Sequence, residues 1–453
     1  MRGRFLTGAV WLILCFSTAA QPSADVLTRL RADPSGWSAA RVARVARREA
    51  PDVHIARARS DEARAAIGLA RATLMPRLAL GAGYSRVSEL DLPPFEFGGM
   101  TTDNPFPQIL NRYVLSADLS VPISSLAEGV PGLRAARNAS EAARWNVESD
   151  QRRVVIATLI VFYQHLRARG SEIVAEDAVR LLSSVVADLD RLHAAGAATR
   201  ADLLEARAEL ASARVQVSTA VAVASATRAR LRAVLNVPAS ESMTFGEDLL
   251  APLPPSPAVE EVVARGLSNR PERHALRRTR AAARDEERVR RRQQVPRVFL
   301  TGGLIYARPN SRIVPSTDRF DGSWELGVAV SWTPNDLAVA RHQMSAARAR
   351  TARAEATLEQ IEDAIHAAAA QAVHDYDAAL QAIDAALDGQ EAAQEGLRAR
   401  RRLLSAGVST SRQVLDAEVQ LRRAQIQFLD AHIRARLARL AIAEAAGDPL
   451  PPP

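Results

Sequence analysis

The stretches AATRADLLEA at residues 197–206 and VSTSRQVLDA at residues 408–417 decide the fold of this chain. Each directly follows a glycine, Gly196 or Gly407, and each opens a long segment without proline. Glycine readily adopts the left-handed backbone conformation that a tight reversal between helices requires. The two stretches therefore predict two helix-turn-helix tips, one in each half of the chain.

The segments after the two glycines carry a seven-residue repeat. Large apolar residues recur at one seam position, and mainly alanines stand three residues later. In the first copy the two sets are Leu203, Leu210, Val217, Ala224 and Leu231, and Ala206, Ala213, Ala220, Thr227 and Val234. In the second copy they are Val414, Leu421, Phe428, Ala435 and Ile442, and Ala417, Ala424, Ala431, Ala438 and Ala445. Large and small residues at alternate seam positions predict closely packed helices, as an ordinary antiparallel coiled coil would also show.

Other landmarks repeat as well, so we divide the chain into two copies of one unit. The first copy covers about 21–236 and the second 258–447, with a proline-rich equatorial linker at 237–257 and a short tail at 448–453. Each copy begins with a helix. We then expect strands at about 77–85 and 113–121, a long helix at 126–193 and a helix at 199–235, and correspondingly strands at 297–307 and 324–333, a long helix at 336–404 and a helix at 410–446. Each long helix would extend roughly 100 Å at 1.5 Å per residue.

The strand segments alternate between apolar and small or polar residues. Leu78, Leu80 and Tyr84 alternate with Ala79, Gly81 and Gly83, whereas Phe299 and Ile305 break the pattern in the third segment. Strands of this length with aromatic ends are typical of transmembrane barrels, although a half-buried sheet of a water-soluble protein would show the same alternation. Membrane-interface positions are expected for Tyr84, Tyr113, Tyr306, Trp324 and Trp332. Four strands cannot close a barrel, but three chains would supply twelve.

Composition excludes several classes of protein. The chain has 453 residues, a formal net charge of +8, 4% aromatic residues and a single cysteine. One cysteine cannot form a disulfide scaffold, and the aromatic stacking platforms that nucleic-acid binding favours are missing. The eight histidines are scattered without metal-ligand spacing, and we find no phosphate-binding loop or nucleophile elbow. We therefore expect no enzyme activity, no cofactor, no metal site and no nucleic-acid partner.

The first twenty residues read as an export signal. Arg2 and Arg4 precede an apolar stretch from Phe5 to Phe16, and small residues at 17–20 form a cleavage site. Cys15 follows Leu14, whereas lipidation requires a small residue before the cysteine, so we expect simple cleavage and leave lipidation open. The mature chain is then expected outside the inner membrane.

These landmarks together closely resemble the TolC family of outer-membrane efflux proteins, over nearly the whole mature chain. The resemblance implies a mainly α-helical homotrimer in which a twelve-stranded barrel in outer-membrane lipid continues into a twelve-helix coiled-coil tunnel through the periplasm. It implies a passive conduit of a tripartite efflux or type I secretion system. The partners would be a periplasmic adaptor, or membrane fusion protein, and an inner-membrane pump of the resistance-nodulation-division, ABC or major-facilitator type. Small molecules, metal ions and polypeptides all stay open as cargo.

The resemblance also assigns roles to residues at the tips. Adaptor docking is expected at Gly196, Ala197, Ala198, Thr199, Gly407, Val408, Ser409 and Thr410, unless these are merely good turn residues. Asp416 stands where the family has an acidic constriction, with Gln413 in place of a second acid. Asp202 and Glu205 either contribute to the constriction or interact only with a helix dipole. The alternative function is a periplasmic coiled-coil adaptor or scaffold, which would need no aromatic-ended strands.

Overall fold

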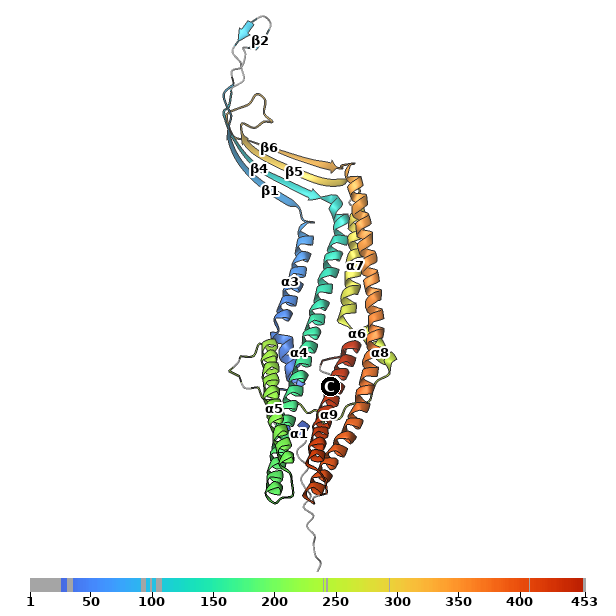
Figure 1. Cartoon of the computed structure of the whole chain (residues 1–453). Coiled ribbons are helices and arrows are strands. Elements are labelled where there is room, and N and C mark those ends of the chain that lie inside the picture. The colour runs from blue at the N-terminus through green and yellow to red at the C-terminus, as the bar shows by residue number, and fades with distance from the viewer. Residues whose placement is uncertain are drawn as a thin grey trace, which may run out of the picture. The chain divides into compact units, whose positions relative to one another are not determined.

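Four segments of alternating sequence form the main sheet of this computed structural model, which describes residues 26–30, 36–90, 95–97, 100–102, 108–238, 240–241, 243–292, 294–406 and 408–450. The strands are β1 (Arg77–Arg86), β4 (Asn111–Pro122), β5 (Arg297–Arg308) and β6 (Asp321–Ser331). They lie side by side in the order β1-β4-β5-β6, and every neighbouring pair is antiparallel (Figure 1). A separate short hairpin consists of β2 (Phe95–Phe97) and β3 (Met100–Thr102).

Helices make up most of the remaining described chain. They are α1 (Val26–Leu30), α2 (Ala39–Glu49), α3 (Pro51–Ala72), α4 (Ile123–Ala194), α5 (Arg200–Leu235), α6 (Val259–Asn269), α7 (Pro271–Arg292), α8 (Asp336–Ser405) and α9 (Ser411–Ala446). The two longest, α4 and α8, contain 72 and 70 residues. A proline inside a helix removes one backbone hydrogen bond, yet α4 continues through Pro131. The expected export signal at 1–20, with Cys15, and the turn residue Gly407 lie outside the described residues.

Two compact units are formed, and each takes segments from both halves of the sequence. Unit 1 comprises 1–43, 158–256 and 375–439, and unit 2 comprises 44–157, 257–374 and 440–453. The sheet belongs to unit 2, and both helical tips belong to unit 1. The two compact units therefore do not coincide with the two sequence repeats, because residues that pack together are contributed by corresponding segments of each repeat.

Unit 1 has its apolar core directly behind the tips. Residues of α4, α5, α8 and α9 form this core, namely Leu182, Val185, Leu189, Leu203, Ala206, Leu210, Ala213, Leu397, Val414 and Leu415. Several of them occupy the heptad seam, and the small seam residues Ala206 and Ala213 are fully buried. Alanine at these positions lets the helix backbones approach closely, which is what the seven-residue pattern predicts.

The linker is held within unit 1 by backbone contacts and a carboxylate. Trp37 and Phe245 form a parallel β-bridge, and Glu247 accepts a hydrogen bond from the backbone N–H of Ala39 at 2.7 Å. Arg436 of α9 donates to the carbonyls of Asp248 and Ala251 at 3.1 and 2.6 Å. These bonds satisfy the polar backbone of a segment that has no regular structure of its own.

In unit 2, one buried arginine holds the end of α9. Arg152 of α4 is 7% exposed and donates to the carbonyl oxygens of Ala443, Gly447 and Asp448 at 3.1, 3.3 and 2.7 Å. The last carbonyls of a helix have no partner within the helix, so the guanidinium supplies the missing donors. Burial lowers the pKa of Arg152 from its usual value, with Glu272 acting in the opposite direction.

Candidate functional site

The register of the four-stranded sheet places apolar residues of all strands on one face. Leu80 pairs with Ala117, which pairs with Leu304, which pairs with Trp324. Among these, Leu80 and Trp324 are 77% and 75% exposed. Other exposed apolar residues on this face are Leu78, Leu115, Leu119, Leu326, Val328 and Val330. A large exposed apolar face of this kind requires a nonaqueous environment or a partner.

The opposite face of the sheet carries small and polar residues. Across the strands, Gly81 pairs with Ser116, Ser116 with Ile305, and Ile305 with Ser323. Asp118 and Gly303 form another pair on this face, next to Glu325. Ile305 therefore has a serine on each neighbouring strand, and the irregular alternation of the third strand does not disturb the register.

Three of the five predicted interface aromatics gather at one end of the apolar face. The rings of Tyr84 and Tyr113 are 5.0 Å apart, and Phe320 lies 5.8 Å from Tyr113 and 5.4 Å from Tyr306. Phe320 precedes β6 and was not among the expected residues, because it falls outside the alternating segment. Trp324 lies farther along β6 and does not belong to this cluster.

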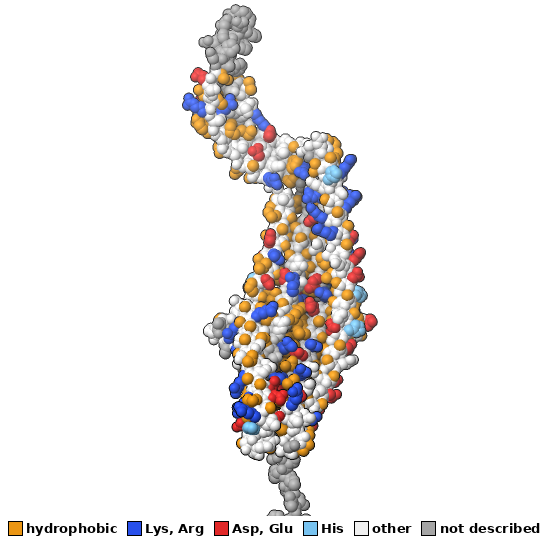
Figure 2. All heavy atoms as spheres, in the orientation of Figure 1, with side chains coloured by type: hydrophobic (Ala, Val, Ile, Leu, Met, Phe, Trp, Pro, Cys, Tyr) orange, Lys and Arg blue, Asp and Glu red, His pale blue; other side chains and the backbone are white. Residues whose placement is uncertain are grey.

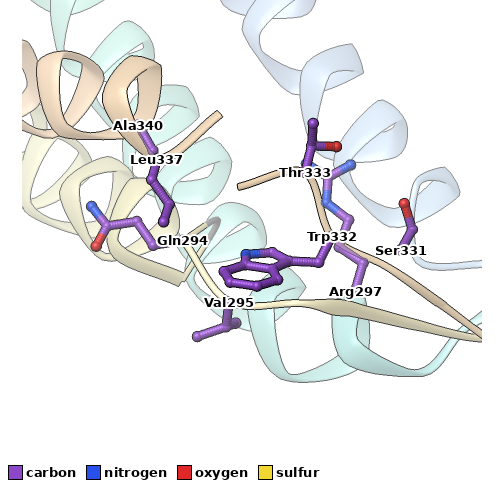
Figure 3. Close-up of a pocket in the computed structure, with 8 residues that line it drawn as sticks. All are labelled: Gln294, Val295, Arg297, Ser331, Trp332, Thr333, Leu337 and Ala340. Atoms are coloured by element: carbon purple, nitrogen blue, oxygen red, sulfur yellow. The ribbon is translucent and has the colours of Figure 1, made fainter. Parts of the chain in front are cut away.

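Trp332 lies at the other end of β6, just after its last paired residue. The strand ends at Ser331, earlier than the expected 333, because Ser331 pairs with Arg297, the first residue of β5. Trp332 is 53% exposed. Its ring lies near Val295 and Leu337 in a small cavity of about 120 Å³, where the strands meet helices α7 and α8 (Figure 3).

The first tip contains both a C-terminal stop for α4 and an N-terminal cap for α5. Gly196 has φ +75°, and the N–H of Ala197 donates to the carbonyl of Leu192 at 2.8 Å. Thr199 caps α5, since its hydroxyl accepts from the N–H of Asp202 at 3.2 Å and the Asp202 carboxylate accepts from the N–H of Thr199 at 3.1 Å. Ala197 and Thr199 are exposed, whereas Ala198 is partly buried against the core.

In the second tip, hydrogen bonds hold the side chain and backbone of Gln413. Gln413 Oε1 accepts from Ser409 Oγ at 2.7 Å and from Arg400 Nη1 at 3.0 Å. Thr410 accepts from the backbone N–H of Gln413 at 3.4 Å. Val408 is 74% exposed, which leaves an apolar side chain at the turn.

The predicted constriction residues have different environments. Asp202 accepts a hydrogen bond from Ser411 at 2.5 Å, and this bond, then those from Thr199, hold its pKa below the usual value. Glu205 lies 3.5 Å from Arg412 in an exposed ion pair. Asp416 is exposed and forms no hydrogen bond or ion pair with any described residue. Of the acids in this set, only Asp416 therefore keeps its carboxylate free of partners in the described chain.

A cavity lies beside the tips between α4, α8 and α9. It measures about 300 Å³, and apolar Val185, Leu192 and Leu404 line it together with Asp188 and Arg401. Both charged groups come from opposite walls and approach to 3.9 Å. The cavity wall therefore contains both apolar and charged side chains.

Glu418 is one of the acids just past the second tip in the sequence, but it was not among the expected constriction residues. It is 2% exposed, lies 3.5 Å from Arg422, and lines a cavity of about 390 Å³. Arg422 is shared with Glu209 at the same distance. Burial raises the pKa of Glu418, and Arg422 opposes this effect. The heptad pattern gave no signal for it, because Glu418 stands beside the seam rather than on it.

The sheet, the two tips and the long helices form the architecture of outer-membrane efflux proteins. The sequence profile of the family described as "Outer membrane efflux protein" matches residues 42–237 and 262–448, and the chain belongs to this family. A comparison with curated protein sequences gave no match.

Solved structures of outer-membrane channels share the fold. The outer-membrane channel OprN is 22% identical, with a TM-score of 0.74 over 94% of this chain and 92% of that chain. The CmeC outer membrane channel of Campylobacter jejuni is 16% identical, with a TM-score of 0.76 over 98% and 94%. The MtrE outer membrane channel of Neisseria gonorrhoeae, solved in its open state, is 18% identical, with a TM-score of 0.75 over 90% and 89%.

None of the described helices combines the length and apolar character needed to cross a membrane. No group of three or more His, Cys, Asp or Glu residues is arranged to hold a metal ion in that part of the chain. Charged side chains of both signs are interspersed over the helices on the face shown in Figure 2.

Proposed function

We propose that three copies of this chain form the outer-membrane duct of a tripartite efflux or type I secretion system. The duct would lie in the outer membrane with a large periplasmic part. It would receive small molecules, metal ions or polypeptides from an inner-membrane pump through a periplasmic adaptor. Cargo selection would belong to the pump, because a passive conduit takes its specificity from the pump that feeds it.

The observation that carries the proposal is a sheet with one apolar face and two open edges. In the described chain β1 pairs only with β4, and β6 pairs only with β5. An open edge exposes a row of backbone donors and acceptors that a second strand can satisfy. Pairing of β6 with β1 of the next copy would continue the sheet, and three copies would close it with the polar face around a lumen.

The spacing of the aromatic residues fits a bilayer. Trp332 lies ten residues beyond Gly322, the strand partner of Tyr306. At about 3.3 Å per residue the two aromatic levels are roughly 33 Å apart along the strand. A strand tilt of about 40° reduces this to about 25 Å, which is the height of the apolar band of an outer-membrane barrel. Tyr84, Tyr113 and Tyr306 would occupy one interface and Trp332 the other.

The tips would provide the periplasmic entrance and the adaptor contact. The exposed side chains at the turns, Ala197, Thr199 and Val408, are short. The neighbouring cavity, lined by Val185, Leu192 and Leu404, would provide an apolar surface for a partner. A helical hairpin of an adaptor can lie in such a groove through its own apolar face. Asp416, with no partner among the described residues, would join its two symmetry copies in an acidic constriction that favours cations.

The assembly is tested by the mass and conductance of the full chain. Protein extracted in detergent should have the mass of three chains by light scattering, and its addition to a planar bilayer should produce discrete ion conductance. A chain that stays monomeric and dissolved without detergent would contradict the proposal and favour the adaptor or scaffold alternative.

Adaptor docking needs a separate experiment. A photo-crosslinking residue at Val408, which is 74% exposed, should capture the adaptor encoded beside this protein. The same residue at Leu69 of α3, which is 71% exposed and lies in unit 2, serves as the matched control and should not capture it. Equal capture at both positions would remove the support for docking at the tips.

A further inference from the structure

A second cavity in unit 1 collects positive charge away from the tips. It measures about 340 Å³ and is lined by α1, α4, α5 and the linker. Three arginines line it, Arg29 from α1, Arg169 from α4 and Arg228 from α5, together with Leu30, Ile173, Met243, Thr244 and Phe245. No acidic side chain is found among the described residues that line it.

Two of the three arginines have their own carboxylates. Arg29 Nη1 donates to both oxygens of Asp177 at 2.6 and 2.8 Å, and Arg169 pairs with Glu172. Arg228 differs, because no carboxylate of the described chain lies within ion-pair distance of its guanidinium. Its Nε is buried without a hydrogen-bond partner in that part of the chain. A buried N–H donor without a hydrogen-bond partner costs free energy. An acceptor bound beside Arg228 would remove this cost.

The charge of Arg228 also acts on a neighbouring histidine, His165. His165 is 0% exposed, and its ring lies 4.5 Å from that of Phe245, a residue of the cavity wall. Its Nδ1 lies 3.0 Å from Thr227 Oγ1, while Nε2 has no hydrogen-bond partner in the described structure. Burial, followed by the charge of Arg228, lowers the pKa of His165 to about 4. The surroundings therefore already repel additional positive charge.

We propose that this cavity binds a phosphate-type oxyanion, with Arg228 as its principal ligand and Arg29 and Arg169 at its rim. Guanidinium groups match tetrahedral oxyanions well, since their planar fork donates two parallel hydrogen bonds. Bound there, the anion would connect α1 and the linker to α4 and α5. The same chemistry could be offered by free phosphate or by the phosphodiester of a lipid headgroup.

Titration calorimetry of the full chain in detergent tests the site, with inorganic phosphate and a soluble short-chain phosphatidylglycerol as separate probes. Wild type should bind inorganic phosphate, and Arg228→Gln should weaken binding by about tenfold or more. The matched control is Arg230→Gln, an exposed arginine on the same helix that does not line the cavity. It removes the same charge and should leave the affinity unchanged.

If the protein binds phosphatidylglycerol but not inorganic phosphate, and Arg228→Gln loses this binding, the oxyanion is a lipid headgroup. Binding of neither probe, or equal loss in both variants, overturns the proposal. Asp25 and Asp33 lie outside the described residues, so their double Asn variant is also measured. Phosphate binding that appears only in this double variant would show that the chain neutralises Arg228 itself, and would overturn the proposal as well.

A folding defect is separated from a binding defect by thermal unfolding. Without ligand, Arg228→Gln should unfold near the wild-type temperature, because the partly exposed guanidinium has no carboxylate partner in the described chain that the substitution would leave unpaired. Saturating phosphate should raise the unfolding temperature of wild type and of Arg230→Gln, but not that of Arg228→Gln. A rise of equal size in all three proteins would mean that phosphate acts elsewhere.

Discussion

Ser411 donates its hydroxyl hydrogen to Oδ1 of Asp202 over 2.5 Å, and this bond joins the first residue of α9 to the first turn of α5. Asp202 also completes the capping box of α5 with Thr199. One carboxylate therefore satisfies the start of its own helix and ties together the two tips of the chain. The contact lies at the end of unit 1 that we propose as the entrance of the duct.

Ser411→Ala should loosen this tie. The variant loses one hydrogen bond from the buried Ser411 hydroxyl to the partly exposed Asp202 carboxylate, which costs about 1.5 kcal/mol of stability. If the tips form the entrance, single-channel conductance should also rise. Ser405→Ala is the control, because within the described chain the Ser405 hydroxyl bonds only to the carbonyl of Arg402 in its own helix. Identical conductance in the two variants would count against a tie at the entrance.

The lowered pKa of Asp202 determines how the stability contributed by this contact changes with pH. Hydrogen bonds lower its pKa in the folded state below the ordinary value of 3.8. Its stabilising contribution is therefore present above that ordinary value and is lost as pH falls through the lowered folded value. Ser411→Ala should reduce this acid-dependent part of the stability, which thermal unfolding between about pH 2 and 5 can measure.

Asp416→Ala is expected to change conduction without changing stability. The carboxylate is exposed and unpaired in the described chain, so the variant should unfold within about 0.5 kcal/mol of wild type. If three copies form the proposed duct, the variant removes three converging charges, which should weaken block by divalent cations and reduce cation selectivity in planar bilayers. Glu444→Ala removes an exposed acid near the other end of the same helix and provides the control. Unchanged cation block in Asp416→Ala would refute the constriction.

Glu418→Gln should alter the pH dependence of stability. Because burial raises the pKa of Glu418 in the folded state, the protonated acid favours folding. The stabilisation is fully present below the unfolded pKa and is lost as pH rises through the raised folded value. The Gln variant should lack this loss and gain relative stability at neutral pH. A wild-type advantage at pH 7 would show that the pairing with Arg422 outweighs burial.

Arg152→Met should destabilise unit 2 by about 3 kcal/mol, because three carbonyl oxygens at the end of α9 lose a charged donor. Among the described residues, the neighbouring Arg153 pairs only with Asp150 of the same helix, at an exposed position. Arg153→Met should therefore change the stability by no more than about 0.5 kcal/mol. Chemical unfolding of both variants measures the difference. Equal effects would mean that helix propensity, not the end of α9, accounts for the loss.

Local sequence periodicity was sufficient for much of the fold. Alternation at Leu78, Leu80 and Tyr84 indicated a strand, and the spacing of Leu203 and Leu210 indicated a helix with one buried side. Gly196 marked the turn, and its positive φ supplies the reason. These features depend on residues a few positions apart, so the chain reveals them without its tertiary structure.

Contacts between distant residues could not be read in the same way. Asp416 and Glu418 stand two positions apart on α9, yet one is exposed and the other is buried beside Arg422. Nothing in their residue type separates them, because burial depends on which neighbouring helix covers each side of α9. The bond between Ser411 and Asp202 likewise joins residues 209 positions apart.

The amino-acid sequence by itself determined the helices, the alternating strands, the first turn and the repetition of one unit, since each follows from spacing along the chain. Only the tertiary structure decided the strand order, the common apolar face, the mixing of both repeats within each compact unit, and the unpaired Arg228. The physical reason is that pairing, register and burial are set by the free energy of long-range contacts. One local pattern is compatible with many such contacts, and folding selects among them.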